Sequence, residues 1–180
     1  MYKKRTPLII ILSGKAKTGK NEIANIIQNY YGEEKCIQVS YAYYLKDYLK
    51  RMHKYNEIDK DRNRTLLQEF GIDFLGNEIN PKFLINRTME DIHIFSYFYD
   101  IIIITDARFI DEIEMPKQFF ENVITIKVTS KYINNLTEDE KKHITETALD
   151  NYQNYDYKIE NDGTKEELKD KIFEVLKGVK

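Results

Sequence analysis

The sequence predicts an α/β fold in which helices cover both faces of a parallel sheet. The first sign is a set of short runs of apolar and β-branched residues with the composition of buried strands: Leu8 to Ser13, Cys36 to Val39, Ile101 to Thr105, Val123 to Val128 and Tyr157 to Glu160. The second sign is the helical periodicity of the stretches between these runs. Strands that alternate with helices form parallel sheets, because the crossover helices must cover both sheet surfaces.

The first predicted strand leads directly into a loop rich in glycine and lysine. It follows three basic residues, as the core of a secretion signal does, but it is short and no small-residue cleavage site follows it. We therefore expect a buried strand. The helix predicted after the loop has one apolar face with the spacing i, i+3, i+4, i+7 and i+8, formed by Ile23, Ile26, Ile27, Tyr30 and Tyr31.

Residues 41–98 interrupt this alternation. From about residue 59 to residue 98 there is no strand signal, and Arg, Glu and Gln are frequent. We expect a helical insertion that stands over the carboxyl edge of the sheet. The alternation then returns and ends in a helix that Thr164 can cap while Glu167 reaches back as a capping box. The apolar face of this last helix consists of Leu168, Ile172, Val175 and Leu176.

Composition limits the classes of function. With 180 residues, 42% hydrophobic and 32% charged, the chain suits one globular domain over residues 1–180. The formal net charge of −2 excludes the global basicity of a nucleic-acid-binding protein, and no stretch approaches the ~20 apolar residues of a membrane span. A single cysteine, Cys36, fits a reducing compartment. We expect a cytoplasmic monomer or homodimer with no nucleic-acid or membrane partner.

The strongest motif is G-K-A-K-T-G-K-N, between the first strand and the first helix. It matches G-x-x-x-x-G-K in the structural context that this motif requires, although a turn that only joins strand to helix is an alternative. Glycines let backbone N–H groups approach a polyphosphate, the helix N-terminus adds a positive dipole, and Lys20 can reach the β- and γ-phosphates. We expect the whole loop to bind nucleotide: Gly14, Lys15, Ala16, Lys17, Thr18, Gly19, Lys20 and Asn21. Asn21 stands where a Ser or Thr usually binds magnesium, and its carboxamide oxygen is a weaker ligand.

A second motif, Asp106-Ala107-Arg108, follows the strand Ile101 to Thr105. Open α/β sheets bind ligands at the carboxyl ends of their strands. Asp106 can hold magnesium directly or through water, and Arg108 can neutralise charge on a transferring phosphoryl group. A purely structural Asp–Arg pair is the alternative. Because both motifs should meet at one edge of the sheet, we expect Lys20, Asp106 and Arg108 to be catalytic.

Candidate acceptor-binding residues lie in the helical insertion: Arg62, Arg64, Gln68 and Arg87. Guanidinium groups suit a phosphate and a carboxamide suits a base or sugar, although a solvated charged face would contain the same residue types. The sequence has no H-R-D catalytic loop to deprotonate a hydroxyl. A phosphate acceptor is already largely ionised near neutral pH, since its second pKa is about 6. We expect a small phosphorylated acceptor.

Five blocks of the sequence together resemble a known family. They are S-G-K-A-K-T-G-K-N from Ser13, S-Y-A-Y-Y-L-K from Ser40, R-T-L-L-Q-E-F-G from Arg64, T-D-A-R-F from Thr105 and L-D-N-Y-Q-N-Y-D-Y-K-I-E-N-D-G from Leu149. They resemble the phage and bacterial deoxynucleoside monophosphate kinases over nearly the whole chain, and the animal-type phosphomevalonate kinases are similar in the same places.

This resemblance implies a three-layer P-loop kinase fold with a five-stranded parallel sheet, an acceptor-binding helical region at about 41–98 and a short lid at about 130–143. It implies ATP and Mg²⁺ as cofactors, with Asn21 and Asp106 as metal ligands, and transfer of a phosphoryl group to a (deoxy)nucleoside monophosphate. The acceptor would face Ser40, Lys46, Arg64, Gln68 and Arg87. The adenine would lie near Asn161 and Gly163.

Three other functions stay open at this point. A phosphomevalonate kinase would perform the same chemistry on an isoprenoid precursor. A P-loop GTPase switch is disfavoured, because the sequence has no N-K-x-D guanine motif. A catalytically weak nucleotide-binding protein is a third possibility, because Asn21 replaces the usual hydroxyl and the expected lid contains no Arg.

Overall fold

The computed structural model describes residues 3–55, 60–132 and 143–179, apart from the side chains of residues 60, 61 and 64. Its strands pair in parallel in the order β2-β3-β1-β4-β5. The strand bounds are β1 (Leu8–Ser13), β2 (Cys36–Val39), β3 (Ile101–Ala107), β4 (Val123–Thr129) and β5 (Tyr157–Glu160). The predicted parallel sheet is therefore confirmed, and β3 and β4 run slightly beyond the apolar runs that predicted them.

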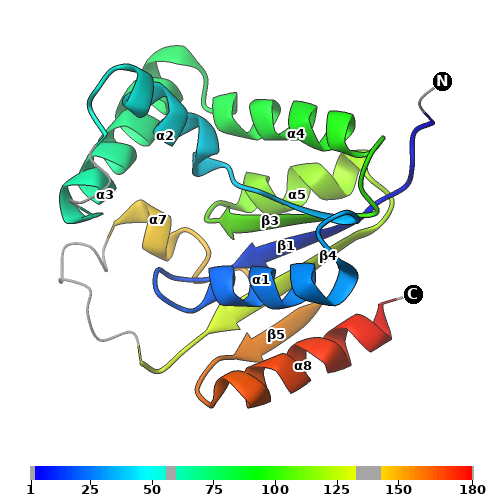
Figure 1. Ribbon diagram of the computed structural model, residues 1–180. Coiled ribbons are helices and arrows are strands. Elements are labelled where there is room, and N and C mark those ends of the chain that lie inside the picture. The colour runs from blue at the N-terminus through cyan, green and yellow to red at the C-terminus, as the bar shows by residue number, and fades with distance from the viewer. Residues whose placement is uncertain (1–2, 56–59, 133–142, 180) are drawn as a thin grey trace.

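The central strand β1 shows how the sheet is buried on both faces. Successive side chains of a strand point to opposite faces. Accordingly Ile10 and Leu12 join the core beneath α1 (Lys20–Tyr31) and α8 (Lys165–Gly178). Ile9 and Ile11 join the core beneath α4 (Phe83–Phe95) and α5 (Ile110–Phe119). The helices thus form two outer layers around the sheet (Figure 1).

The predicted capping box at the start of α8 is present. The Thr164 hydroxyl accepts a hydrogen bond from the Glu167 backbone N–H at 3.2 Å, and the Glu167 carboxylate accepts one from the Thr164 N–H at 2.8 Å. These bonds satisfy two backbone donors that a helix start otherwise leaves unpaired.

The helical insertion consists of α2 (Ala42–Arg51), α3 (Lys60–Gln68), a π-helix η1 (Glu69–Ile79) and α4. In Figure 1, α2 and α3 lie beyond the arrowheads of the strands, at the carboxyl edge of the sheet. The π-helix was not predicted. It packs closely on α2: a Cβ atom added to Gly71 would lie 3.1 Å from Leu45 Cδ1.

A short helix, α7 (Ile144–Thr147), also lies at the carboxyl edge of the sheet (Figure 1). Most of the predicted lid, residues 133–142, lies outside the described residues. Within the described part of the chain, no helix combines the length and apolar character needed to cross a membrane.

Candidate active site at the carboxyl edge of the sheet

The two sequence motifs meet at the edge of the sheet where β1 and β3 end. These strands are neighbours, and Ser13 at the end of β1 pairs with Ala107 at the end of β3. On its other side β1 pairs with β4. The sheet therefore continues on one side of β1 through β3 to β2 and on the other side through β4 to β5, which makes the end of β1 a topological switch point. Ligands of open α/β sheets bind in the crevice at such a switch point.

The phosphate loop is tied to the neighbouring strand β4. Gly14 has a φ of 149°, and a Cβ atom there would stand 2.2 Å from the Val128 carbonyl oxygen. Only glycine fits this approach. Lys17 and Gly19 also have positive φ, at 64° and 95°. Such a series of turns directs successive backbone N–H groups into one concavity, which is the geometry of an anion-binding nest.

Lys20 begins α1 and is nearly buried, with 8% of its surface exposed. Its ammonium group donates to the carbonyl oxygens of Gly14 at 2.8 Å and Lys15 at 2.7 Å. Burial, and then the charge of Arg108, lower the pKa of Lys20 from 10.5 to about 7, while Glu146 and Asp106 act in the opposite direction. The ammonium therefore lies within the field of the second motif.

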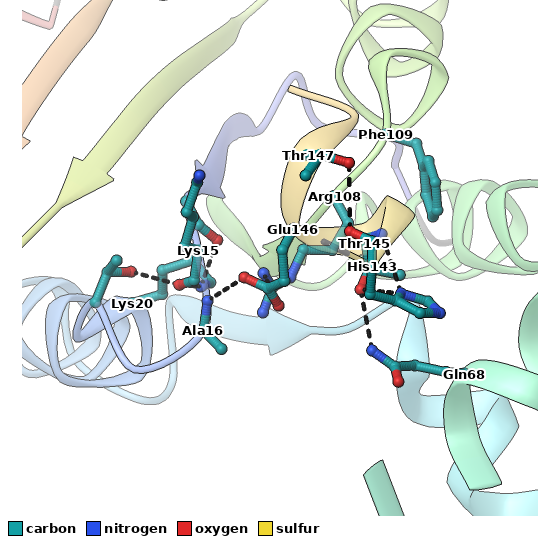
Figure 2. A network of polar contacts seen from close by, with 12 residues as sticks. Lys15, Ala16, Lys20, Gln68, Arg108, Phe109, His143, Thr145, Glu146 and Thr147 are labelled. Atoms are coloured by element: carbon teal, nitrogen blue, oxygen red, sulfur yellow. Dashed lines mark hydrogen bonds and ion pairs between the residues drawn. The ribbon is translucent and has the colours of Figure 1, made fainter. Parts of the chain in front are cut away.

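Arg108 reaches the phosphate loop through an acid from α7, as Figure 2 shows. Its Nη1 atom donates to Glu146 Oε1 at 2.9 Å. The other carboxylate oxygen, Oε2, accepts a hydrogen bond from the backbone N–H of Ala16 at 2.8 Å. Glu146 is buried, with 2% of its side chain exposed. One buried carboxylate thus joins the loop to the arginine of the second motif.

A second buried acid, Glu112, fixes the backbone at Arg108. Its Oε2 atom accepts hydrogen bonds from the N–H groups of Arg108 at 2.6 Å and Phe109 at 3.0 Å. Burial raises the pKa of Glu112 from 4.5 to about 8; nearby Asp106 adds to this, and the two backbone donors oppose it. These bonds define the start of α5 and fix the backbone position from which the Arg108 side chain extends.

Asp106 holds the start of α2. Its Oδ2 atom accepts hydrogen bonds from the Ser40 hydroxyl at 2.7 Å and the Ala42 N–H at 3.0 Å, and Oδ1 accepts one from the Tyr41 N–H at 2.9 Å. The first N–H groups of a helix have no partner within the helix. Asp106 supplies that partner from β3 and so positions the helical insertion against the sheet.

Three hollows meet around Arg108, which lines all of them. The first, which we name the helical hollow, has a volume of about 830 Å³ and lies among α2, α3, η1, α5 and α7. The β4 hollow, of about 290 Å³, lies between the loop and the end of β4. The β2 hollow, of about 960 Å³, lies between the start of α1 and the end of β2. Glu146 lines the first two.

The helical hollow combines apolar walls with a few polar side chains. Its apolar members include Leu45, Leu67, Ile72, Leu84 and Phe109. Its carboxamides are Asn63, Gln68 and Asn77. Pockets of this volume, lined mainly by apolar side chains and a small number of polar groups, suit drug-sized ligands.

Gln68 links the helical hollow to α7. Its Nε2 atom donates to the Thr145 hydroxyl at 3.3 Å, and that hydroxyl lies 3.0 Å from His143 Nδ1 (Figure 2). Thr145 and Glu146 are consecutive residues. The short helix α7 therefore contacts the phosphate loop through one side chain and the helical insertion through the next.

The structure brings together most, but not all, of the residues that the sequence singled out. The β2 hollow is lined by Ala16, Lys17, Gly19, Lys20, Asn21, Ser40, Lys46, Asp106 and Arg108. Gly14, Lys15 and Thr18 line the β4 hollow, and Lys46 and Gln68 line the helical hollow.

Four other sequence-predicted residues line none of these three hollows: Arg62, Arg87, Asn161 and Gly163. Arg87 instead stacks over the ring of Tyr44, with its guanidinium carbon 4.7 Å from the ring centroid, and pairs with Glu90. Arg62 is exposed on α3, and Gly163 is exposed between β5 and α8. Asn161 supports the phosphate loop: its Nδ2 atom donates to the Thr18 carbonyl oxygen at 3.0 Å. Arg64 belongs to α3, but its side chain lies outside the described residues.

The oxygen donors at this edge fit a magnesium ion that is carried mainly by a nucleotide. Asn21 and Asp106 line the same hollow. Asp106 accepts a single hydrogen bond at Oδ1, and a carboxylate oxygen can accept a second partner as well. Among the described residues, no group of three or more His, Cys, Asp or Glu side chains is arranged to hold a metal. Mg²⁺ commonly binds through one or two protein oxygens, substrate phosphates and water.

Sequence reasoning missed Glu112, Thr145 and Glu146. Glu112 has a partial local signal: it stands at the third position of α5 and accepts a hydrogen bond from the Phe109 N–H at the helix start, but Phe109 has no side-chain oxygen to complete a capping box. Glu146 has none: its partners, Ala16 and Arg108, are far away in the sequence and belong to other motifs.

Comparisons with known proteins agree with this geometry. A family model described as deoxynucleotide monophosphate kinase matches residues 63–172, more than half of the chain. A search of curated proteins finds no significant match. The match is to nucleotide kinases and gives no support to the phosphomevalonate kinase alternative.

Solved structures similar to this chain include several small-molecule kinases. Dephospho-CoA kinase from Campylobacter jejuni has a TM-score of 0.52 and 14% identity, over 97% of this chain and 98% of its own. Shikimate kinase from Bacteroides thetaiotaomicron has a TM-score of 0.50 and 15% identity, over 94% and 98%. A variant APS kinase from Mycobacterium tuberculosis has a TM-score of 0.50 and 7% identity, over 96% and 99%. At these identities, the likeness establishes the fold.

Proposed function

Because this chain belongs to the deoxynucleotide monophosphate kinase family, we propose that it transfers the γ-phosphoryl group of ATP to a (deoxy)nucleoside monophosphate. Phosphoryl transfer by a nucleotide kinase follows from the family. The choice of donor and acceptor and the roles of individual residues are the proposal. One observation carries it: Arg108 lines both the β2 hollow beside the phosphate loop and the helical hollow, so its guanidinium stands between the two substrate sites.

On the donor side, the phosphate loop and Lys20 would bind the polyphosphate. The positive-φ turns at Lys17 and Gly19 support this assignment, because they turn backbone donors into the concavity. Lys20 would exchange its two carbonyl partners for phosphate oxygens, which carry full negative charge and are better partners for an ammonium group. Asn161 would act by supporting the loop at Thr18.

On the acceptor side, the helical hollow would bind the nucleoside monophosphate. Leu45 and Phe109 offer apolar surface to a base, and carboxamides such as Gln68 offer hydrogen bonds to its edge. Lys46 lines both this hollow and the β2 hollow, so we assign it to the acceptor phosphate. Ser40 and Arg64 retain their predicted acceptor roles as proposals. The stacking of Arg87 on Tyr44 favours a supporting role there instead.

The acids around the helical hollow favour a phosphate acceptor over a hydroxyl acceptor. Four of the residues that line it are acidic: Asp106, Asp111, Glu112 and Glu146. In the absence of nucleotide, each of them has a partner: Asp106 accepts from the start of α2, Asp111 pairs with Lys82, Glu112 accepts from the backbone at Arg108, and Glu146 pairs with the Arg108 side chain. A hydroxyl acceptor needs a base to remove its proton, whereas an ionised phosphate needs only positioning and charge neutralisation.

The proposed transfer is a direct in-line displacement. An oxygen of the acceptor phosphate forms a bond to the γ-phosphorus of ATP as the bond from that phosphorus to the β–γ bridging oxygen breaks. The bridging oxygen leaves with the electron pair as part of ADP, and the acceptor becomes a diphosphate. Lys20 and Arg108 would stabilise the charge on the transferring group. When bound with the nucleotide, Mg²⁺ would be held by Asn21 and Asp106 and would neutralise phosphate charge.

We place this reaction in a reducing compartment such as the cytoplasm. The only cysteine of the sequence, Cys36, is buried in the sheet and has no second cysteine to pair with. Burial raises the pKa of its thiol to about 12, which suppresses the reactive thiolate.

The test of the catalytic assignment is Lys20→Ala, with Lys35→Ala as a matched control. Lys35 is exposed just before β2, at the opposite edge of the sheet. We expect Lys20→Ala to lower kcat/KM by at least about 100-fold, as the loss of one charged donor to a transition state typically does, while the fold is retained. Lys35→Ala should match the wild type. Undiminished ADP formation by a folded Lys20→Ala protein would refute the assignment.

The acceptor is tested with a panel of deoxynucleoside monophosphates, ribonucleoside monophosphates and 5-phosphomevalonate, each with ATP and Mg²⁺. ADP formation that depends on a nucleoside monophosphate supports the proposal. Turnover with 5-phosphomevalonate but with no nucleoside monophosphate of the panel would contradict it. ATP binding without acceptor-dependent ADP formation across the panel would also contradict it, and would indicate a nucleotide-binding protein without turnover.

A further inference from the structure

The buried carboxylate of Glu146 occupies donors that suit a phosphoryl group. Its two oxygens are used separately, one by the Ala16 N–H of the phosphate loop at 2.8 Å and one by the Arg108 guanidinium at 2.9 Å. Figure 2 shows the carboxylate between these two groups. An anion held at once by a loop amide and a guanidinium is what a P-loop enzyme needs for its substrate phosphate.

A polyphosphate and this carboxylate cannot share the same donors. The Ala16 amide has a single N–H group, which the carboxylate already uses. The charge of Glu146 also acts on Lys20, whose pKa it raises, so the carboxylate lies within the electrostatic reach of the loop ammonium. Two anions at one cluster of positive groups repel each other, and the one with more charge and more oxygens gains more from that cluster.

We propose that Glu146 is an internal ligand of the phosphate loop, which the phosphates of the donor nucleotide displace. The inference rests on the proposed function and adds a second occupant to its donor site. Glu146 holds the loop and Arg108 in an anion-binding arrangement, and because it competes with phosphate it lowers the affinity for ATP. The observed affinity for ATP is then lower than the intrinsic affinity of the loop by the free energy of returning Glu146 to solvent.

A rival role makes the opposite forecast. If Glu146 only positions Arg108 and keeps its contacts when the nucleotide is bound, removal of its charge would loosen Arg108 and weaken both binding and transfer. If it competes with phosphate, removal of its charge leaves Arg108 without its buried counter-ion and increases the attraction of the site for phosphate.

The test is Glu146→Gln, with ATP and inorganic tripolyphosphate as separate probes in titration calorimetry. The carboxamide keeps the size of the side chain but loses the charge, and it turns a donor toward one of the two donors that Glu146 accepts from. Because hydrogen bonds to ionised groups are roughly twice as strong as neutral ones, we expect both Kd values to fall about tenfold. In turnover assays, KM for ATP should fall.

Glu22→Gln is the matched control, because it makes the same chemical change on the first turn of α1, where Glu22 pairs with Lys165. It should leave the Kd for both probes unchanged. Glu146→Asp is the second variant: it keeps the charge, but its shorter side chain cannot span both donors, so it should also tighten binding. It serves as the test if Glu146→Gln does not fold.

The outcomes separate this inference from the proposed function. If the wild type binds both probes and neither Glu146 variant binds more tightly, the inference fails and the kinase assignment stands. A fall in kcat with unchanged or weaker ATP binding would establish the rival positioning role. If neither wild type nor variants bind either probe, the proposed function itself fails, and the inference with it.

Discussion

At the scale of single residues, the site concentrates charge around a nearly buried lysine. Lys20 is held between loop carbonyls and has Arg108 nearby, and its pKa falls from 10.5 to about 7, chiefly because burial disfavours the ammonium form. The same lysine is the group proposed to meet the phosphates of ATP. Its charge therefore depends on what occupies the loop.

This dependence predicts that ATP binding takes up a proton. At about pH 8, above the lowered pKa, most Lys20 side chains in the free protein are neutral. Phosphate oxygens favour the ammonium and raise the pKa again, so binding should draw most of one proton from the buffer. Calorimetry of ATP binding in two buffers with different ionisation enthalpies measures this uptake.

The uptake should disappear in Lys20→Met and persist in Lys35→Ala. An equal binding enthalpy in both buffers for the wild type would show that Lys20 keeps its proton throughout. The sequence singled out this lysine because a contiguous motif contains it, and its role in binding and catalysis stays a proposal. Glu146 could not be predicted, because its importance arises from Ala16 and Arg108, which tertiary structure alone brings to it.

At the scale of elements, contacts between the end of one element and the start of another position the site. Asp106, at the end of β3, accepts three hydrogen bonds from residues 40–42 and so holds the start of α2. The sequence indicated a magnesium ligand at Asp106, and that role stays a proposal. The structure adds a positioning role that no local pattern announces.

Asp106→Asn should destabilise the protein by about 2 kcal/mol. An asparagine offers one acceptor oxygen, and its NH₂ group would face an N–H or O–H donor, so at least one buried donor loses its partner. Ser40→Ala removes a single hydrogen bond to the same carboxylate and should cost about 1 kcal/mol. Urea denaturation measures both. Equal losses in the two variants would contradict this account of Asp106.

The elements themselves differed in how well the sequence predicted them. The strands were predictable because β-branched apolar runs stand between polar segments, and α8 because its capping box is contiguous. The π-helix η1 was not. Its close contact with α2 at Gly71 depends on Leu45, which is distant in the sequence, and the wide turn of a π-helix has no composition of its own.

At the scale of the whole molecule, the buried acid Glu112 and the buried lysine Lys20 couple folding to pH. Glu112 is the clearest case. Its pKa is about 8 in the folded protein, against 4.5 for an unperturbed carboxyl group. Between these values the folded state keeps a proton that the unfolded state has released. The unfolded state therefore binds fewer protons, and the free energy of unfolding falls as pH rises through this range.

Glu112→Gln should remove this dependence. The neutral carboxamide oxygen can still accept the N–H groups of Arg108 and Phe109, so the start of α5 is retained. At about 1.4 kcal/mol per pH unit, the wild type should lose about 3 kcal/mol between about pH 5 and pH 7 relative to this variant. Urea denaturation at several pH values gives the comparison. Parallel pH profiles for the two proteins would refute the assignment.

The two adjacent contacts of α7 have a consequence for how each substrate changes the affinity for the other. Thr145 touches Gln68 of the helical insertion, and its neighbour Glu146 touches Ala16 of the phosphate loop. A displacement of α7 (Ile144–Thr147) by one ligand would therefore reach the proposed binding site of the other. Thermodynamic reciprocity then requires two factors to be equal: the factor by which ATP changes the affinity for the nucleoside monophosphate, and the factor by which the monophosphate changes the affinity for ATP.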